Sequence, residues 1–295
     1  MGTIAEKLTY LNETKNAIKE AIVNKGVSVN DSDTFRSYAD KISSIEAGGG
    51  TGGDAELEAS FISSIDDSLG ANVTKLPSGL TSIGKRAFYE KTNLVSPKLP
   101  DSITSIGEEA FRNCTNLALT ELPSNLTLIG GRAFYYCSKL KLTELPDSIT
   151  SIGEYAFYRC EYLALTKLPD SLTSVGTYAF YYCSKLKLTE LPSNLTSIGD
   201  KCFHSALSSY GLLNIKGDVK SIGMEAFRYA GVSNVKLPNV TSVPTLGSYA
   251  FENTSISKGT GYIYVPDDLV ESFKTASNWS TYANQIKGLS ELPTE

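Results

Sequence analysis

The sequence predicts a solenoid of short β-strands and helical turns, in which a unit of 23 residues repeats along most of the 295-residue chain. The first observation is the phrase Ile-Gly-x-x-Ala-Phe, whose glycines recur 23 residues apart and, near the end, 24 apart. Two further residues keep the same step: a proline that follows a leucine, and a cysteine in the middle units. A fixed period of about 20–50 residues indicates a repeat architecture. The repeat glycines are Gly84, Gly107, Gly130, Gly153, Gly176, Gly199, Gly223 and Gly247.

One unit, residues 117–137, shows how each repeat is expected to fold. Its leucines alternate along a first extended segment, and Ile129 ends a second segment that suits a half-buried strand. Gly130 follows where the chain must turn sharply, and Ala133 and Phe134 are expected to form a single helical turn that places the phenyl ring in the core. Because a slip of one residue would turn the apolar side chains outward, the constant step fixes the register between units. No unit can bury its apolar side alone, so stability is expected to come from contacts between stacked units.

The full phrase of the repeat is Leu-Pro-x-x-Leu-Thr-x-Ile-Gly-x-x-Ala-Phe-x-x-Cys, which holds from about Leu76 to Phe251. This phrase closely resembles that of the BspA-like class of bacterial leucine-rich repeat. The resemblance implies a leucine-rich repeat solenoid. It also implies a surface binding protein and not an enzyme, because members of that class mostly act in this way.

Residues 1–47 are predicted to form a helical hairpin. Five apolar residues with a 4-3-7-4 spacing form a heptad seam on the first helix, and a second helix is expected to begin near Asp31. Two interpretations stay open: the hairpin closes on itself or caps the solenoid, or it is an attachment and oligomerisation module whose seam packs against other copies of the chain. The seam residues are Ile4, Leu8, Leu11, Ile18 and Ile22.

The segments 4–19 and 35–42 also resemble short helical segments in structural proteins of phages and prophages of Gram-positive bacteria. That resemblance implies a place on the virion, commonly in the tail, where other virion proteins would contact the N-terminal helices. Residues 48–53 follow as Gly-Gly-Gly-Thr-Gly-Gly. A phosphate-binding loop would need a Gly-Lys-Ser/Thr sequence there, so we expect a flexible linker.

Residues 54–260 are assigned to the solenoid and residues 261–295 to a C-terminal cap of a strand and helices. The first coil, residues 54–75, departs from the repeat, as terminal repeats do when one face meets water. In the cap, the alternating segment 262–265 predicts a strand and Asp267 is the expected N-cap of a helix. The single tryptophan, Trp279, is expected in the core of the cap.

Composition excludes several functions. The chain has a net charge of −5 and no run of lysines or arginines, so nucleic-acid binding is not expected. It has no run of about 18 apolar residues, so no membrane insertion is expected. The residues after Met1 lack the apolar core of a secretory signal peptide. We therefore expect a protein that is made in the bacterial cytoplasm and located on the virion, with the bacterial cell surface as the alternative.

The cysteines are predicted to be structural. Cys114, Cys137, Cys160 and Cys183 occupy the same place in successive units, and Cys202 replaces an alanine. We interpret them as small buried apolar groups, and leave open whether neighbouring coils bring them within disulfide range. The sequence contains no Cys-x-x-Cys motif and no Cys/His cluster. Neither a metal site nor a cofactor is therefore expected.

The sequence offers little for catalysis. Any Ser-His-Asp or Cys-His site would need the single histidine, His204, which occupies a variable position after Phe203 that we expect to be exposed. The adjacent acids Glu108 and Glu109 are expected on the solvated surface, and not as the paired carboxylates of a glycoside hydrolase. We therefore do not expect an enzyme.

The variable positions of the repeat are the better candidates for function. Regular stacking should align them in a row, and tyrosine offers a flat ring and a hydroxyl at low entropic cost. Two interpretations stay open: the rings only pack along the ridge between coils, or they form a surface that binds a glycan or a protein of a host cell. The candidate residues are Tyr89, Arg112, Tyr135, Tyr136, Tyr155, Tyr158, Arg159, Tyr178, Tyr181, Tyr182 and His204.

The sequence of residues 133–146 recurs unchanged at residues 179–192, which indicates duplication of a 46-residue pair of units. Such copying favours a ligand that is itself repetitive. The sequence thus predicts a binding protein of a phage or prophage tail that recognises a host-surface glycan or protein. A bacterial cell-surface or secreted adhesin is the alternative.

Overall fold

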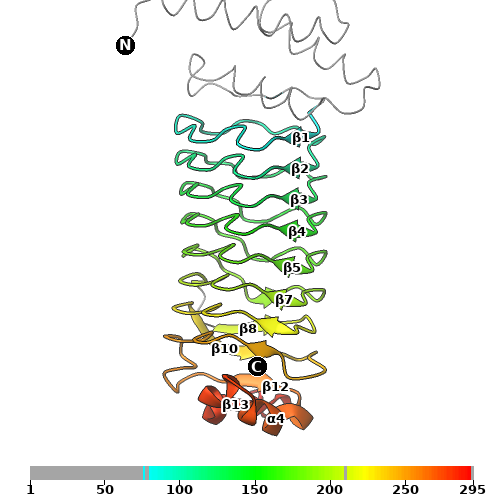
Figure 1. Cartoon of the computed structure of the whole chain (residues 1–295), viewed down its shortest axis with the longest axis vertical. Helices are drawn as coiled ribbons and strands as arrows, with labels where there is room; N and C mark the ends of the chain where they lie inside the picture. Colours follow the sequence, from blue (N-terminus) through cyan, green and yellow to red (C-terminus); the bar gives the residue numbers. More distant parts are fainter. Residues whose placement is uncertain (1–75, 77–79, 209–210, 294–295) are drawn as a thin grey trace, which may run out of the picture.

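The computed structural model describes residues 76, 80–208 and 211–293 (Figure 1). The described chain winds into a tall stack of similar coils and ends in a short helical layer, which confirms the predicted solenoid. The hairpin and linker predicted for residues 1–53, and the degenerate first coil predicted for residues 54–75, lie outside the described residues.

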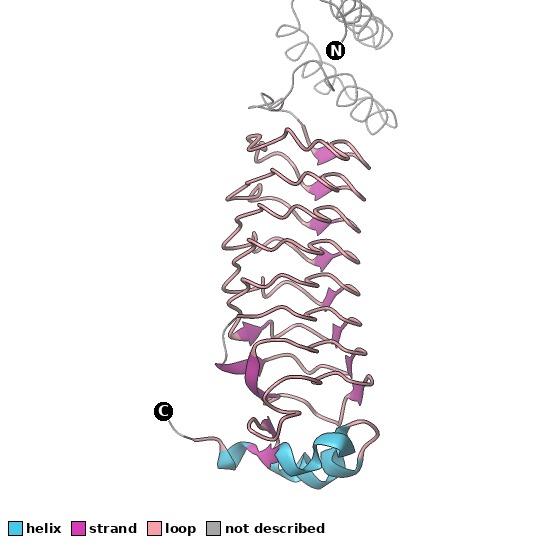
Figure 2. Cartoon of the chain, turned by 90° about the vertical axis from the view of Figure 1, so that its left-hand side faces the viewer, coloured by secondary structure: helices cyan, strands magenta, loops and turns pink. Residues whose placement is uncertain are grey.

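One side of the stack is an eight-stranded parallel sheet with one very short strand from each coil (Figure 2). Neighbouring strands pair with Ser82 opposite Ser105 and Ile83 opposite Ile106, and this register is kept along the stack. The inward isoleucine of each pair is buried, so the constant step sets the register as predicted. The strands are β1 (Ser82–Ile83), β2 (Ser105–Ile106), β3 (Leu128–Ile129), β4 (Ser151–Ile152), β5 (Ser174–Val175), β7 (Ser197–Ile198), β9 (Ser221–Ile222) and β11 (Thr245–Leu246).

A second parallel sheet forms only in the C-terminal half, where the leucine-rich segment of each coil becomes regular. Its longest strands, β8 and β10, have five residues each. In the described coils before Glu190 the same segment does not join this sheet, although Leu117, Leu119 and Leu122 are buried in the core as predicted. The strands are, in spatial order, β6 (Glu190–Leu191), β8 (Gly211–Ile215), β10 (Val232–Lys236), β12 (Ile263–Val265) and β13 (Ile286–Gly288).

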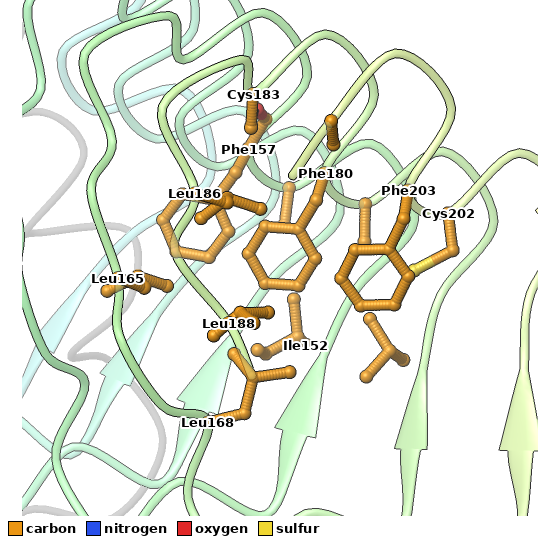
Figure 3. Packing of buried hydrophobic residues seen from close by; sticks show 14 of the residues in the cluster. Ile152, Phe157, Leu165, Leu168, Phe180, Cys183, Leu186, Leu188, Cys202 and Phe203 are labelled. Atoms are coloured by element: carbon orange, nitrogen blue, oxygen red, sulfur yellow. The ribbon is translucent and has the colours of Figure 1, made fainter. Parts of the chain in front are cut away.

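A continuous column of phenylalanine rings fills the centre of the stack (Figure 3). Each ring stacks on the ring of the next coil, with centroids 5.0 Å apart at the first step and 5.3–5.4 Å apart along the rest. Loss of one such ring leaves a cavity that neighbouring coils cannot fill, because their own rings are fixed by the same backbone bonds. The column consists of Phe88, Phe111, Phe134, Phe157, Phe180, Phe203, Phe227 and Phe251.

The cysteines lie beside this column, and all five are buried free thiols. The Sγ atom of Cys137 lies 3.0 Å from the carbonyl oxygen of Phe111 in the preceding coil, and Cys160 and Cys183 repeat the contact. Burial raises the pKa of the Cys114 thiol to about 12. These thiols therefore act as weak hydrogen-bond donors between coils and not as reactive groups.

The loop after each repeat glycine differs from the prediction. The expected helical turn at Ala133 and Phe134 is a series of tight turns, because Arg132 and Tyr136 on either side have left-handed backbone conformations. These turns send alternate N–H groups to the next coil: Arg132 donates to Glu154, and Tyr136 donates to Tyr158, each over 2.8 Å. A continuous helix would keep those N–H groups within its own coil. The hydrogen bonds from alternate residues therefore join the loops of neighbouring coils.

Backbone contact between coils explains the repeat glycine. The N–H of Gly153 donates to the carbonyl oxygen of Ile129 over 2.9 Å. A Cβ atom on Gly153 would lie only 2.5 Å from the backbone nitrogen of Gly131 and 2.7 Å from the carbonyl carbon of Gly130. Any side chain at this position would therefore push two coils apart.

The C-terminal layer supplies the hydrogen bonds that a further coil would have made. Asn278 donates to the carbonyl oxygen of Leu246, the last strand residue of the first sheet, and the Trp279 indole donates to that of Pro244. The Tyr282 hydroxyl accepts the N–H of Phe251, the last ring of the column. Trp279 is fully buried, which confirms its predicted place in the core of the cap.

The helices of this layer begin differently from the prediction. The first turn runs Asp267–Leu269 and continues as α4, Val270–Thr275, but its N-cap is Pro266, with no side-chain hydrogen bond. The Asp267 carboxylate instead accepts a 2.6 Å hydrogen bond from the Ser290 hydroxyl. It therefore ties the helix to the end of the chain. The remaining helical segments are the 3-10 turns Trp279–Gln285 and Leu289–Glu291.

We expect Gly153→Ala to lower the free energy of unfolding by about 1–3 kcal/mol, because its Cβ would overpack two backbones. Gly131→Ala is the matched control, since a Cβ on that neighbouring glycine would meet nothing closer than 3.5 Å. Urea denaturation followed by circular dichroism measures both variants. Equal stability of the two would show that the repeat glycine is not needed for coil contact.

Candidate binding surface

The predicted candidate residues fall into three parallel columns, which we call the tyrosine ladder. Each coil contributes one residue two positions after its glycine, one residue directly after its phenylalanine, and the residue after that. The first column is Arg86, Glu109, Arg132, Tyr155, Tyr178, Lys201, Glu225 and Tyr249. The second is Tyr89, Arg112, Tyr135, Tyr158, Tyr181, His204, Arg228 and Glu252, and the third is Glu90, Asn113, Tyr136, Arg159, Tyr182, Ser205, Tyr229 and Asn253.

The backbone of the first and third columns is left-handed, and most of these positions hold residues that seldom adopt that conformation. Tyr155 and Tyr178 have φ values of 56° and 57°, and Tyr182 has 58°. A positive φ costs a residue with a Cβ roughly 1–2 kcal/mol, and hydrogen bonds to the next coil offset this cost. The same geometry turns the side chains of adjacent positions to one surface.

Stacking between coils holds the tyrosine rings in place. Tyr135, Tyr158 and Tyr181 stack at 4.7 and 4.8 Å with nearly parallel planes, and Tyr155 stacks on Tyr178 at 4.6 Å. The packing interpretation therefore holds for the ring faces, because neighbouring rings cover each other. The rings are only partly buried, so part of each ring edge remains open to solvent, and Tyr182 is 39% exposed.

Cations lie over several of these rings. Arg112 lies between Tyr89 and Tyr135, at 5.4 and 5.1 Å from their centroids. One column over, Arg159 lies between Tyr136 and Tyr182, at 5.4 and 5.0 Å. Such distances are typical of cation–π contacts. Each arginine thus lies between two tyrosines of its own column.

A buried carboxylate neutralises the arginines near the first described coil. Glu109 is only 4% exposed and receives hydrogen bonds from both Arg86 and Arg112. Burial alone would raise the pKa of Glu109, but these hydrogen bonds outweigh it and hold the pKa below the ordinary glutamate value. The expectation that Glu109 lies on the solvated surface is therefore wrong. The positive charges of Arg86 in the preceding coil and Arg112 in the same coil stabilise the carboxylate in this buried position.

His204 is also buried, against the expectation of an exposed histidine. Its ring stacks on Tyr181 at 4.7 Å and so continues the second column in place of a tyrosine. Its Nε2 atom lies 3.5 Å from a Glu225 carboxylate oxygen, and its Nδ1 atom lies 3.1 Å from the Ser205 hydroxyl. Burial is the main cause that lowers the pKa of His204 below the ordinary histidine value, against the opposing effect of Glu225.

The contacts among Ser205, His204 and Glu225 do not form a hydrolase site. The carboxylate of Glu225 is shared with Lys201 and Arg228, at 3.6 and 3.2 Å, and is not reserved for the imidazole. Tyr181 covers one face of the imidazole, and His204 is only 6% exposed, so little of the ring is open to a substrate. These residues therefore stabilise the ladder.

Within residues 76, 80–208 and 211–293, no group of three or more histidine, cysteine or acidic residues is placed to hold a metal ion. Among the same residues, no helix is long and apolar enough to cross a membrane.

The structure brings all eleven candidate residues together in the columns of the ladder, with His204 buried among them, whereas the predicted oligomerisation seam from Ile4 to Ile22 lies outside the described residues. Sequence analysis missed the carboxylates Glu109 and Glu225, which neutralise the cations at the two ends of the ladder. The sequence does contain a signal for both acids. Both acids occupy the position two residues after a repeat glycine, in the column that elsewhere holds tyrosine or a cation.

Comparison with protein families gave one match. The model of the BspA-type leucine-rich repeat region matches residues 69–164 and 150–267 in six copies. A comparison with curated proteins gave no match.

Several solved structures are similar to the chain. A leucine-rich repeat protein of T. pallidum is 26% identical, with a TM-score of 0.42, over 61% of this chain and 75% of that one. A leucine-rich cell surface protein of Faecalibacterium prausnitzii is 25% identical, with a TM-score of 0.41, over 65% of this chain and 59% of that one. A leucine-rich repeat protein of Bacteroides ovatus is 22% identical, with a TM-score of 0.39, over 73% and 68% of the two chains.

We expect the Glu109 carboxylate to make stability depend on pH. Because its pKa is lowered in the folded protein, its contribution is fully present above the unfolded pKa of about 4.3 and is lost as the pH falls through the folded pKa. Melting temperatures of the wild type and Glu109→Gln should therefore differ most near neutral pH and converge below about pH 4. A difference that stays constant across this range would contradict the ion-pair account.

Proposed function

The chain belongs to the family of BspA-type leucine-rich repeat proteins, and we propose that its tyrosine ladder recognises a glycan or a protein on the surface of a host cell. The leucine-rich repeat solenoid is typically a non-enzymatic binding scaffold, and no enzyme family is indicated. The observation that carries the proposal is the ladder itself, a continuous row of ordered aromatic and cationic side chains on one side of the stack.

Two physical features support a binding role. The tyrosines are already ordered by stacking, so a ligand would not have to immobilise them on binding, and this lowers the entropic cost of association. The verbatim recurrence of residues 133–146 at 179–192 places similar groups two coils apart. A repetitive ligand can engage both copies at once and gain affinity from the second contact.

We propose that this protein belongs to a phage or prophage tail, where residues 1–47 would attach it to other virion proteins or to further copies of the chain. The support is the resemblance of segments 4–19 and 35–42 to phage structural proteins. The alternative is a cell-surface or secreted adhesin, which the family resemblance supports equally. Mass spectrometry of purified virions and of the bacterial surface fraction distinguishes the two: detection in the surface fraction alone would exclude the tail.

We expect simultaneous Tyr135→Ala, Tyr158→Ala and Tyr181→Ala substitutions to weaken binding to host cell walls at least tenfold. Removal of a single well-ordered aromatic anchor commonly costs more than about 1.4 kcal/mol, the equivalent of tenfold. Pull-down of the purified protein by cell walls of the host bacterium measures the effect.

The control carries Glu121→Ala, Glu144→Ala and Lys167→Ala, which are exposed positions in neighbouring coils on the face formed by the leucine-proline segments. Circular dichroism confirms that both triple variants are folded. If the tyrosine variant binds as well as this control, the ladder is not the binding site.

A further inference from the structure

The middle of the tyrosine ladder differs from its two ends in charge. We call the residues from Arg132 to Tyr182 that belong to the ladder the central patch. Its members are Arg132, Tyr135, Tyr136, Tyr155, Tyr158, Arg159, Tyr178, Tyr181 and Tyr182. No acidic residue occurs among them, although the whole chain has a net charge of −5. The nearest acids in the sequence are Glu154 and Glu161, which lie outside the three columns and are exposed.

Arg159 is the central cation of this patch. At the ends of the ladder the cations have carboxylate partners: Arg112 pairs with Glu109, and Arg228 pairs with Glu225. Among the described residues, Arg159 forms no ion pair with a carboxylate, and its guanidinium lies over the rings of Tyr136 and Tyr182. Arg132 likewise lies over a ring, that of Tyr155 at 4.9 Å, without an acidic partner in the described part of the chain.

The tyrosines around Arg159 are placed to donate hydrogen bonds and not to stack on a ligand. Stacking at 4.6–4.8 Å covers ring faces of Tyr135, Tyr155, Tyr158, Tyr178 and Tyr181, so a ligand reaches mainly their partly exposed edges. Burial raises the pKa of Tyr135, Tyr155 and Tyr181. These hydroxyls therefore stay protonated at neutral pH and do not repel an anion.

This arrangement also selects among ligand classes. Single-stranded nucleic acids bind by stacking bases on aromatic faces, and these faces are already occupied. A row of hydroxyl donors beside unpaired guanidinium groups instead matches oxygen acceptors, above all carboxylate and phosphate oxygens. An extended polymer with regularly placed acidic groups fits a patch that repeats from coil to coil.

We propose that the central patch binds an acidic glycan, whose carboxylate or phosphate groups are held by Arg159 and Arg132 and whose sugar hydroxyls meet the tyrosine edges. This inference rests on the proposed function and narrows it to one ligand class. Binding of a protein instead of an acidic glycan would contradict the inference.

Binding is measured with two matched pairs of polysaccharides on the full chain. Polygalacturonic acid and its methyl ester test carboxylates, and phosphomannan and neutral mannan test phosphates. We expect at least one acidic probe to bind tenfold or more tightly than its neutral counterpart, with affinity that falls as salt is added. Equal binding of the members of both pairs, or binding of neither acidic probe, would overturn the inference.

The substitution Arg159→Gln tests whether Arg159 holds the acidic group of the glycan. We expect it to weaken binding of the preferred acidic probe about tenfold, because it removes the unpaired guanidinium. Lys98→Gln makes the same change of charge at an exposed residue on the leucine-proline face and should leave binding unchanged. Equal losses in the two variants would mean that only net charge matters and would refute a specific site.

Two outcomes distinguish failure of the acidic-glycan inference from failure of the proposed function. If protease-treated cell walls no longer capture the wild type, and the acidic probes do not bind, the ligand is a protein: the acidic-glycan inference falls while recognition through the ladder stands. If the triple tyrosine variant still binds cell walls fully, both proposals fall.

Discussion

Direct backbone hydrogen bonding between neighbouring coils is the interaction on which the rest of this structure depends. It joins the strand side through contacts such as Gly153 to Ile129, and it joins the loop side through N–H groups from left-handed residues such as Arg132 and Tyr136. Both sets of bonds close only when equivalent residues lie opposite each other. A constant number of residues per coil is therefore needed, and the glycine is required where two backbones pass too closely for a Cβ.

Function follows from the same constraint. Once the loops are bonded to each other, side chains at equivalent positions have to lie one above the next, whatever their type. Tyrosines then stack, arginines enter the gaps between rings, and like charges meet unless an acid separates them. Glu109 and Glu225 provide that separation at the two ends of the ladder, whereas the central patch has no such acid. The charge pattern of a linear repeat thus becomes the charge pattern of a surface.

Much of the architecture could be predicted from the period alone, because the step of the glycines determines the register and the inward residues. The inward phenylalanines follow from that pattern, and beyond the repeat the strand at Ile263–Val265 follows from its alternating residues. The prediction of a helical turn at Phe134 was wrong. The spacing of apolar residues does not reveal which residues adopt a left-handed backbone conformation, and tyrosine and arginine rarely adopt it. The positions of His204 and Glu109 were wrong for a related reason: their burial depends on residues one coil away, such as Tyr181 and Arg86. Local composition does not contain that information.

Removal of one coil tests the dependence on register most directly. Deletion of residues 133–155 removes 23 residues and joins Arg132 to Ala156, which keeps the glycine-to-phenylalanine spacing of the repeat. Deletion of residues 133–154 removes one residue fewer and lengthens that spacing by one. Thermal unfolding followed by circular dichroism should show a cooperative transition near that of the parent for the first variant, and a much lower or absent transition for the second. Equal melting of the two deletions would contradict the account, because coil contact would then not require a fixed register.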